Sequence, residues 1–157
     1  MYKGVKRVLD FTIALMALLV LWPVLLIVAV IIKLTSPGPV IFKQKRIGLD
    51  GKVFEIYKFR SMVVGAETQG SGDYSGKGDA RVTPIGKIIR ATSIDELPQF
   101  INILKGEMSF VGPRPPLAFH RWDYSDYSDF LLRMFEVRPG ITGLAEINGW
   151  EDVEWNK

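Results

Sequence analysis

Residues 11–32 read FTIALMALLVLWPVLLIVAVII, and this stretch decides how the rest of the chain is organised. Its 22 residues carry no charge. A helix rises by about 1.5 Å per residue, so this run is just long enough to cross a hydrocarbon core of roughly 30 Å. A secretory signal peptide has a shorter apolar region and a small-residue cleavage site, which residues 33–37 (KLTSP) do not resemble. The run therefore predicts a membrane segment.

Two features of this segment argue against a simple single span. Pro23 lies in its middle, where a missing N–H and a bulky ring break or kink a helix, and Trp22 beside it prefers a membrane interface. Basic residues also flank the run on both sides: Lys3, Lys6, Arg7, Lys33, Lys43, Lys45 and Arg46. The positive-inside rule draws both ends to the cytoplasm, which a re-entrant helical hairpin bent at Pro23 satisfies. A bitopic helix with a tolerated proline kink is the alternative.

The composition indicates one compact domain behind this anchor. The chain has 157 residues, 48% of them hydrophobic, which is enough for one core and too few for two comfortable ones. The net charge of +3 is mild, and the basic residues form no stripe, so we expect a membrane surface and no nucleic acid as partner. We expect an anchor over residues 1–34 and one cytoplasmic domain over residues 35–157.

The residue types present limit the kinds of site that the chain can build. It has no cysteine, which excludes disulfides, thiolate chemistry and cysteine-based zinc sites. Its single histidine, His120, cannot form a multi-histidine metal site. A divalent ion would have to depend on carboxylates and phosphate, which are the ligands that Mg²⁺ prefers.

A β-hairpin is predicted directly after the anchor. Residues 35–39 (TSPGP) form a turn-rich hinge, because two prolines and a glycine oppose regular structure. Residues 40–44 and 53–59 are rich in β-branched and aromatic side chains and predict two strands. The Asp50-Gly51 pair between them is a strong hairpin signal.

Helices are predicted further along the chain. The strongest helix pattern covers residues 94–104, with Ser93 and Glu96 as a capping box and Gly106 at its end. Residues 84–90 predict a shorter helix. The apolar stripe expected to be buried on the longer helix consists of Leu97, Phe100, Ile101 and Leu104.

Two other stretches complete an α+β fold with a membrane re-entrant helix, a small β-hairpin and several short helices. Residues 65–79 contain almost no apolar side chain and predict a mobile loop, which either closes over a ligand or is a plain linker. Residues 117–136 mix aromatic and charged side chains, which is compatible with a helix that ends before Arg138-Pro139-Gly140.

Asp95 and Glu96 are the carboxylates best placed for chemistry. Unpaired N–H groups and the positive end of the helix dipole favour anions at a helix start, so this position suits phosphate. A carboxylate there can act as a nucleophile toward phosphorus or as a ligand for Mg²⁺ that bridges phosphate oxygens. Acidic residues are also ordinary in a first helical turn, and the capping box alone would account for Glu96.

Five basic residues lie in apolar or proline-rich settings where a charge needs a partner. They are candidates for binding phosphate, which arginine contacts through two parallel hydrogen bonds. The alternative for each is an ion pair with a nearby carboxylate or a position along the membrane surface. The five residues are Lys58, Arg60, Arg90, Arg114 and Arg138.

Six motifs occur in order along the chain: residues 6–10 (KRVLD), 36–42 (SPGPVIF), 57–62 (YKFRSM), 92–99 (TSIDELPQ), 104–115 (LKGEMSFVGPRP) and 138–143 (RPGITG). With these motifs the chain resembles the bacterial sugar transferases over nearly its whole length. These are monotopic polyprenyl-phosphate phosphoglycosyl transferases that begin the assembly of exopolysaccharides, O-antigens and some glycoproteins. The resemblance implies an enzyme on the cytoplasmic face of the bacterial inner membrane.

The resemblance also implies a mechanism and roles for residues. Asp95 would attack the β-phosphate of a UDP-sugar, expel UMP and form a phosphoglycosyl-aspartate, which the polyprenyl phosphate then attacks. Glu96 would help to hold Mg²⁺, Arg90 and Arg114 would contact phosphate, and Lys58 lies in a motif that lines the site. The N-terminal segment would be a re-entrant helix broken at a proline.

Three departures from the family pattern stand out. Trp22 occupies a position that often holds serine, and Asn148-Gly149-Trp150 lacks an arginine that commonly follows this glycine. Catalytic domains of the family usually continue well past the position of Trp155, so we expect residues 35–157 to lack the C-terminal part. The alternative function is a membrane-anchored nucleotide-sugar-binding module or an inactive fragment of such an enzyme.

Overall fold

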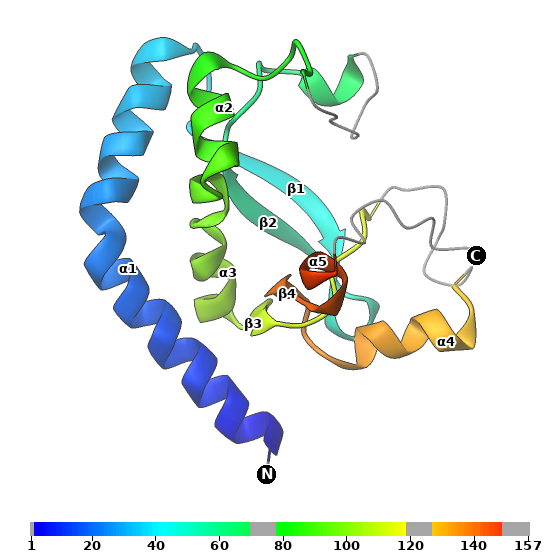
Figure 1. Ribbon diagram of the computed structural model, residues 1–157. Coiled ribbons are helices and arrows are strands. Elements are labelled where there is room, and N and C mark those ends of the chain that lie inside the picture. Colours follow the sequence, from blue (N-terminus) through cyan, green and yellow to red (C-terminus); the bar gives the residue numbers. More distant parts are fainter. Residues whose placement is uncertain (1, 70–77, 119–126, 149–157) are drawn as a thin grey trace. The chain divides into compact units, whose positions relative to one another are not determined.

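The computed structural model describes residues 2–69, 78–118 and 127–148 and contains both helices and strands (Figure 1). This mixture confirms the α+β prediction. The elements in chain order are α1 (Tyr2–Thr35), β1 (Ile41–Ile47), η1 (Leu49–Gly51), β2 (Val53–Phe59), η2 (Ala66–Thr68), α2 (Pro84–Ala91), η3 (Ile94–Glu96), α3 (Gln99–Lys105), β3 (Ser109–Val111), α4 (Asp129–Leu132), η5 (Arg133–Glu136), β4 (Gly140–Thr142) and α5 (Leu144–Ile147).

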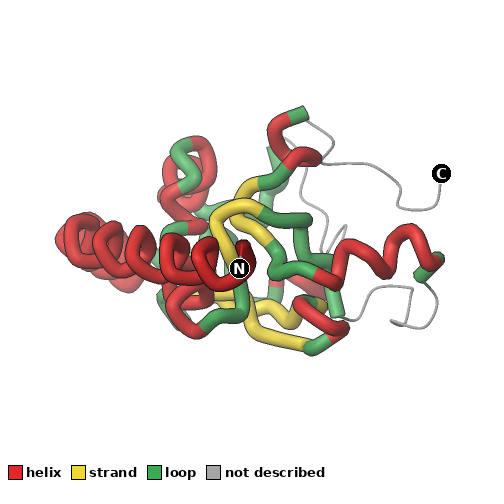
Figure 2. The backbone as a smooth tube through the Cα atoms, turned by 90° about the horizontal axis from the view of Figure 1, so that it is seen from below, coloured by secondary structure: helices red, strands yellow, loops and turns green. Residues whose placement is uncertain are grey.

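Helix α1 contains the apolar run and continues through Trp22 and Pro23 without a break in its secondary structure (Figures 1 and 2). The helical assignment therefore continues through Pro23, and the bend predicted at this residue stays a prediction. The proline removes one backbone hydrogen bond, which a long helix tolerates when the rest of its ladder is intact. Among the described residues α1 is long and apolar enough to be a membrane anchor. Its re-entrant path in a bilayer stays a prediction.

The predicted β-hairpin is confirmed. Asp50 and Gly51 both adopt positive φ, at 55° and 73°, and the Gly48 N–H donates to the Lys52 carbonyl over 2.8 Å. Strand β1 ends three residues later than predicted, at Ile47 rather than Gln44. The extension pairs with residues 116–118, because Ile47 N–H donates to the Pro116 carbonyl and Ala118 N–H to the Lys45 carbonyl. Such a distant partner cannot be read from the local sequence.

The chain forms two compact units, each with its own core. The first unit comprises Met1–Ala17, Gln44–Ile56 and Gln99–Lys157, and the second comprises Leu18–Lys43 and Tyr57–Pro98. Both units include part of α1, so their boundaries differ from the predicted division at residue 34. That division is a functional one and stays a prediction.

The core of the first unit forms where α1, β2 and α3 supply apolar side chains. Its buried residues are Ala14, Ile56, Ile103 and Met108. Phe100 and Leu104 pack against this core as predicted. Ile101, also predicted to be buried, is exposed, because the helix begins only at Gln99 and turns a different face inward. Strands β3 and β4 form a parallel pair in this unit, with Ser109 opposite Gly140.

The core of the second unit brings together the later part of α1, the hairpin and α2. Its buried residues are Val28, Ile32, Phe59 and Ile89. Helix α2 confirms the helix predicted over residues 84–90, and the Thr83 hydroxyl caps it by accepting from the Gly86 N–H over 3.0 Å. Gly86 is required there, because a Cβ atom at this position would lie 1.9 Å from the Ser61 carbonyl oxygen.

Three other predictions need correction or lie partly outside the described residues. The single helix over residues 94–104 is wrong: η3 ends at Glu96, and α3 begins at Gln99, after Pro98. Proline lacks the N–H that a continuous helix would need at this point. Of the helix predicted over residues 117–136, residues 129–136 are helical, residues 117–118 pair with β1 instead, and residues 119–126 lie outside the described part. In the predicted loop, residues 66–68 form η2, and residues 70–77 are likewise outside the described part.

Replacing Gly86 with alanine should destabilise the protein by about 1–3 kcal/mol, because the new methyl group would meet a backbone carbonyl that cannot move aside easily. Thermal unfolding in detergent, followed by tryptophan fluorescence, measures this change. Gly4→Ala is the matched control, since a Cβ atom there has no neighbour within 4 Å. Equal unfolding temperatures for the two variants would contradict the close approach seen at Gly86.

Candidate active site

A sharp turn after α2 presents the two candidate carboxylates. Helix α2 ends at Ala91, and Ser93 then adopts a left-handed conformation with φ of 56°. This conformation costs about 1–2 kcal/mol for a residue other than glycine. The following 3-10 turn contains Asp95 and Glu96. Because each residue of a 3-10 helix rotates the chain by about 120°, the two neighbouring side chains point in different directions.

The predicted capping box is not formed. The Ser93 side chain makes no capping hydrogen bond, and its role lies in the backbone conformation that reverses the chain before η3. The sequence carries no signal for this role, since glycine or asparagine is the usual signal for a left-handed residue. Glu96 is correspondingly available for another partner.

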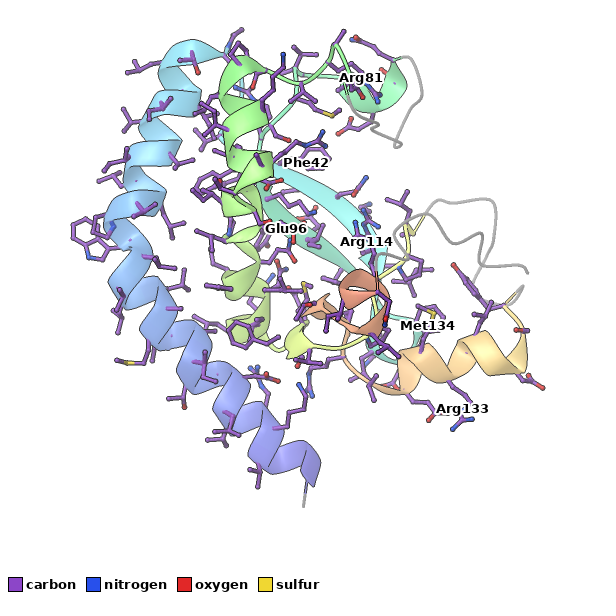
Figure 3. The ribbon with its side chains drawn as sticks, viewed as in Figure 1. Phe42, Arg81, Glu96, Arg114, Arg133 and Met134 are labelled. Atoms are coloured by element: carbon purple, nitrogen blue, oxygen red, sulfur yellow. The ribbon has the colours of Figure 1, made fainter. Side chains whose placement is uncertain are left out.

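That partner is Lys58 on strand β2. Its ammonium nitrogen lies 2.6 Å from Glu96 Oε1, and the two side chains are only 20% and 28% exposed. Figure 3 labels Glu96 beside the ribbon of the hairpin. A pair that is shielded from water to this extent is screened less than a surface ion pair. The structure thus brings together two of the residues predicted from separate motifs.

Asp95 is the buried member of the dyad, with 8% of its surface exposed. Burial raises the pKa of its carboxyl above the ordinary value of 3.8, and the negative charge of Glu96 raises it further. Lys58 and Arg90 act in the opposite direction and lower this pKa. Asp95, Glu96, Lys58 and Arg90 therefore form one electrostatic cluster within the second unit.

Arg60, also predicted to bind phosphate, holds the hinge that follows α1. Its guanidinium is buried and donates to the carbonyls of Pro37 at 2.6 Å and Ser36 at 2.7 Å, while Nε has no partner among the described residues. Gly38 makes room for it, since a Cβ atom there would lie 2.1 Å from Arg60 Nη1. These contacts give Arg60 a structural task, and its contact with phosphate stays a prediction.

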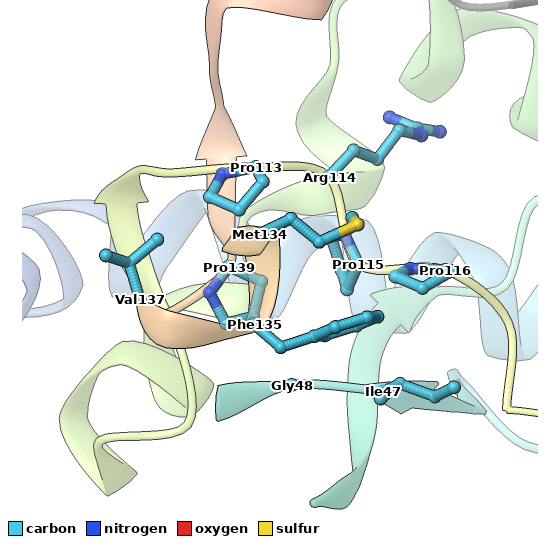
Figure 4. Close-up of a pocket in the computed structure, with 10 residues that line it drawn as sticks. All are labelled: Ile47, Gly48, Pro113, Arg114, Pro115, Pro116, Met134, Phe135, Val137 and Pro139. Atoms are coloured by element: carbon cyan, nitrogen blue, oxygen red, sulfur yellow. The ribbon is translucent and has the colours of Figure 1, made fainter. Parts of the chain in front are cut away.

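Arg114 and Arg138 belong to the first unit. The Arg138 Nε–H donates to the Gly106 carbonyl over 2.7 Å, at the turn after α3. Arg114 lies at the edge of a shallow hollow whose other residues are largely apolar, among them Met134 and Phe135. Its guanidinium points away from these apolar side chains (Figure 4). The phosphate contacts predicted for both arginines stay predictions.

The carboxylates present are compatible with a magnesium ion that is bound together with phosphate. No group of three or more metal-ligating side chains occurs among the residues that the structure describes. Mg²⁺ commonly takes only one or two carboxylates and completes its shell with water and substrate phosphates. Asp95 and Glu96 fit this mode, because only one oxygen of Glu96 is engaged by Lys58.

A family model described as "Bacterial sugar transferase" matches residues 1–157. The chain belongs to this family. The resemblance inferred from the six motifs is thereby confirmed, and the cluster around Asp95 lies inside the matched region.

Curated relatives differ in the sugar that their names specify. A UDP-glucose:undecaprenyl-phosphate glucose-1-phosphate transferase of Klebsiella pneumoniae is 48% identical over 145 residues, which is 92% of this chain and 31% of the relative. A UDP-N-acetylgalactosamine-undecaprenyl-phosphate N-acetylgalactosaminephosphotransferase of Aeromonas hydrophila is 45% identical over 146 residues, covering 93% of this chain and 34% of the relative. The chain thus spans about a third of each.

A third relative has a length closer to that of the chain. The exopolysaccharide production protein PSS of Rhizobium leguminosarum bv. phaseoli is 46% identical over 147 residues, which is 92% of this chain and 74% of the relative. About three quarters of this relative therefore aligns with the chain.

Replacing Asp95 with asparagine should stabilise the protein at pH 7. The pKa of Asp95 is raised in the folded state, so its contribution to stability is present while the carboxyl is protonated and is lost as the pH rises through that pKa. Asparagine avoids burying the charge, and the gain should shrink as the pH falls toward 3.8. Thermal unfolding at both pH values measures it.

The exposed Asp129 provides the control for this experiment. Asp129→Asn should leave the unfolding temperature nearly unchanged at both pH values. A lower unfolding temperature for Asp95→Asn than for the unsubstituted protein at pH 7 would mean that attraction by Lys58 and Arg90 outweighs burial.

Proposed function

We propose that this chain transfers a sugar-1-phosphate from a UDP-sugar to undecaprenyl phosphate or a related polyprenyl phosphate and releases UMP. The observation that carries the proposal is the buried Asp95 carboxyl, whose pKa Lys58 and Arg90 lower, in a member of the bacterial sugar transferase family. The names of the relatives, with a UDP-sugar donor and an undecaprenyl-phosphate acceptor, support the substrate classes. The reaction would be the first membrane step of exopolysaccharide or O-antigen assembly.

In the first step an Asp95 oxygen attacks the β-phosphorus of the donor. A new oxygen–phosphorus bond forms, the bond to the bridging oxygen breaks, and UMP leaves with the electron pair. In the second step an oxygen of the acceptor phosphate attacks the same phosphorus and releases the Asp95 carboxylate. Two displacements at one carboxylate allow a water-soluble donor and a lipid acceptor to react in turn.

The basic residues reduce the repulsion between negative charges that this reaction has to overcome. An anionic nucleophile must approach a diphosphate, and Lys58 and Arg90 supply positive charge next to Asp95. Glu96 is the residue proposed to hold Mg²⁺, which would neutralise phosphate charge when bound. Arg114 and Arg138 are proposed to contact phosphate groups of the substrates.

We place both ends of α1 on one side of the membrane, the cytoplasmic face of the bacterial inner membrane. Basic residues lie on both sides of the apolar run, with Lys6 and Arg7 before it and Lys33 after it. The positive-inside rule draws both of these flanks to the cytoplasm. This charge pattern supports a monotopic, re-entrant arrangement over a bitopic helix.

The decisive test combines purified protein in lipid nanodiscs with UDP-sugars, Mg²⁺ and undecaprenyl phosphate. Asp95→Asn should lower UMP release by about 10³-fold or more, because the amide cannot form the covalent intermediate. Asp129→Asn is the control with the same chemical change. A labelled sugar-phosphate on Asp95, formed without acceptor, would identify the intermediate. Binding of the donor without UMP release would indicate the alternative, a nucleotide-sugar-binding module.

Replacing Lys58 with glutamine should move the acid limb of the pH–rate profile to higher pH. Lys58 lowers the pKa of Asp95, so its removal raises that pKa and a higher pH is needed to ionise the nucleophile. The rate of UMP release measured across pH tests this shift. The exposed Lys87 serves as control through Lys87→Gln. An acid limb that stays in place would contradict electrostatic control of Asp95 by Lys58.

A further inference from the structure

The first turns of α1 make polar contacts for which the proposed chemistry has no use. Arg7 Nη1 donates to the Ile103 carbonyl over 2.5 Å, and Nη2 donates to the Leu104 carbonyl over 2.9 Å. These carbonyls lie in the last turn of α3, where a helix leaves acceptors only partly engaged, and that of Ile103 also accepts from the Gly106 N–H at 3.0 Å. A cation at this end is also favoured by the helix dipole. The planar guanidinium thus satisfies two neighbouring acceptors at once.

Asp10, one turn after Arg7, contacts a different element. Its Oδ2 accepts from the Ser109 hydroxyl at 2.8 Å and from the Lys6 ammonium at 3.0 Å, and its Oδ1 accepts from the Phe110 N–H at 3.4 Å. Lys6 also contacts the Ser109 hydroxyl directly. Both Asp10 and Ser109 are buried, so this is a shielded polar network between α1 and β3.

The contact residues occupy one side of α1. Arg7, Asp10 and Ala14 are spaced by three and four residues, which places them on a single face of a helix. Ala14 is fully buried in the core that contains Ile103 and Met108. Two polar residues and one apolar residue therefore hold the same face of α1 against the end of α3 and β3. All of these residues belong to the first unit.

We propose that Lys6, Arg7 and Asp10 form a polar clasp that fixes the start of α1 to α3 and β3 and sets the orientation of these first turns within the first unit. They are positioning residues and touch no reacting atom. The competing explanation is that Lys6 and Arg7 serve only as positive charges that keep the N-terminus in the cytoplasm. The two explanations differ in what they predict for substitutions that remove these hydrogen bonds but keep the charge. Only the clasp predicts that such substitutions displace the start of α1.

Two substitutions separate these explanations without changing the net charge. Arg7→Lys keeps the positive charge but loses the planar fork that reaches two carbonyls. Ser109→Ala removes the hydroxyl that donates to Asp10 and alters no charge at all. Lys33→Gln is the matched control, because it removes a basic residue at the far end of α1, where Lys33 is exposed.

The orientation of α1 can be measured directly, since the chain has no cysteine of its own. Nitroxide labels on Val5→Cys and Ile101→Cys, at positions 55% and 43% exposed, report the distance between the start of α1 and α3 by pulsed electron double resonance. The full chain is used in lipid nanodiscs without substrate, so the result does not depend on the proposed function. We expect one narrow distance distribution.

In this background, Arg7→Lys and Ser109→Ala should each raise the population of displaced distances about tenfold, the effect of losing one charge-assisted hydrogen bond. Lys33→Gln should leave the distribution as it is. Should Arg7→Lys not fold, Ser109→Ala alone decides. A distribution that stays narrow in the charge-preserving variants, or an equal broadening by Lys33→Gln, would overturn the clasp.

Discussion

The attraction between Lys58 and the neighbouring carboxylates Asp95 and Glu96 is the interaction on which the site depends. Burial raises the pKa of Asp95, and the charge of Glu96 adds to this effect. Lys58 and Arg90 lower this pKa and so favour the ionised carboxylate, the form that the proposed attack on phosphorus requires. Carboxyl groups whose pKa is shifted by burial and by specific charged partners are common at functional sites.

Strand β2 sets where Lys58 can act. Ile56 is buried in one core and Phe59 in the other, so Lys58 is held between two anchored side chains. A shift of one residue along the strand would turn each side chain to the opposite face and remove both anchors. Lys58 then reaches Glu96, which lies 38 residues further along the chain, at 2.6 Å. The packing of two apolar residues thus determines the position of the charge that supports the dyad.

Much of this arrangement could be predicted from residue patterns, because the patterns are local. The Asp50-Gly51 turn predicted the hairpin, and the adjacent Asp95 and Glu96 predicted the candidate dyad. The features that could not be predicted depend on contacts or backbone conformations with no local signal in the sequence. Ser93 resembled a helix cap, whereas its left-handed backbone makes the turn. Arg60 has a structural contact that no local pattern indicated, because its guanidinium lies beside Gly38 and donates to the hinge carbonyls, while its predicted contact with phosphate stays a prediction.

The apolar N-terminal helix is part of the fold as well as a candidate anchor. Ala14 completes one core, and Val28 and Ile32 complete the other, so neither core consists of residues after position 34 alone. The remaining face of α1 is strongly apolar and exposed, as Val20 and Leu26 illustrate. A helix with one face buried in protein and the other suited to lipid joins the folding of the domain to its membrane location. Helix α1 therefore completes both cores, and its exposed apolar face makes it a candidate membrane anchor.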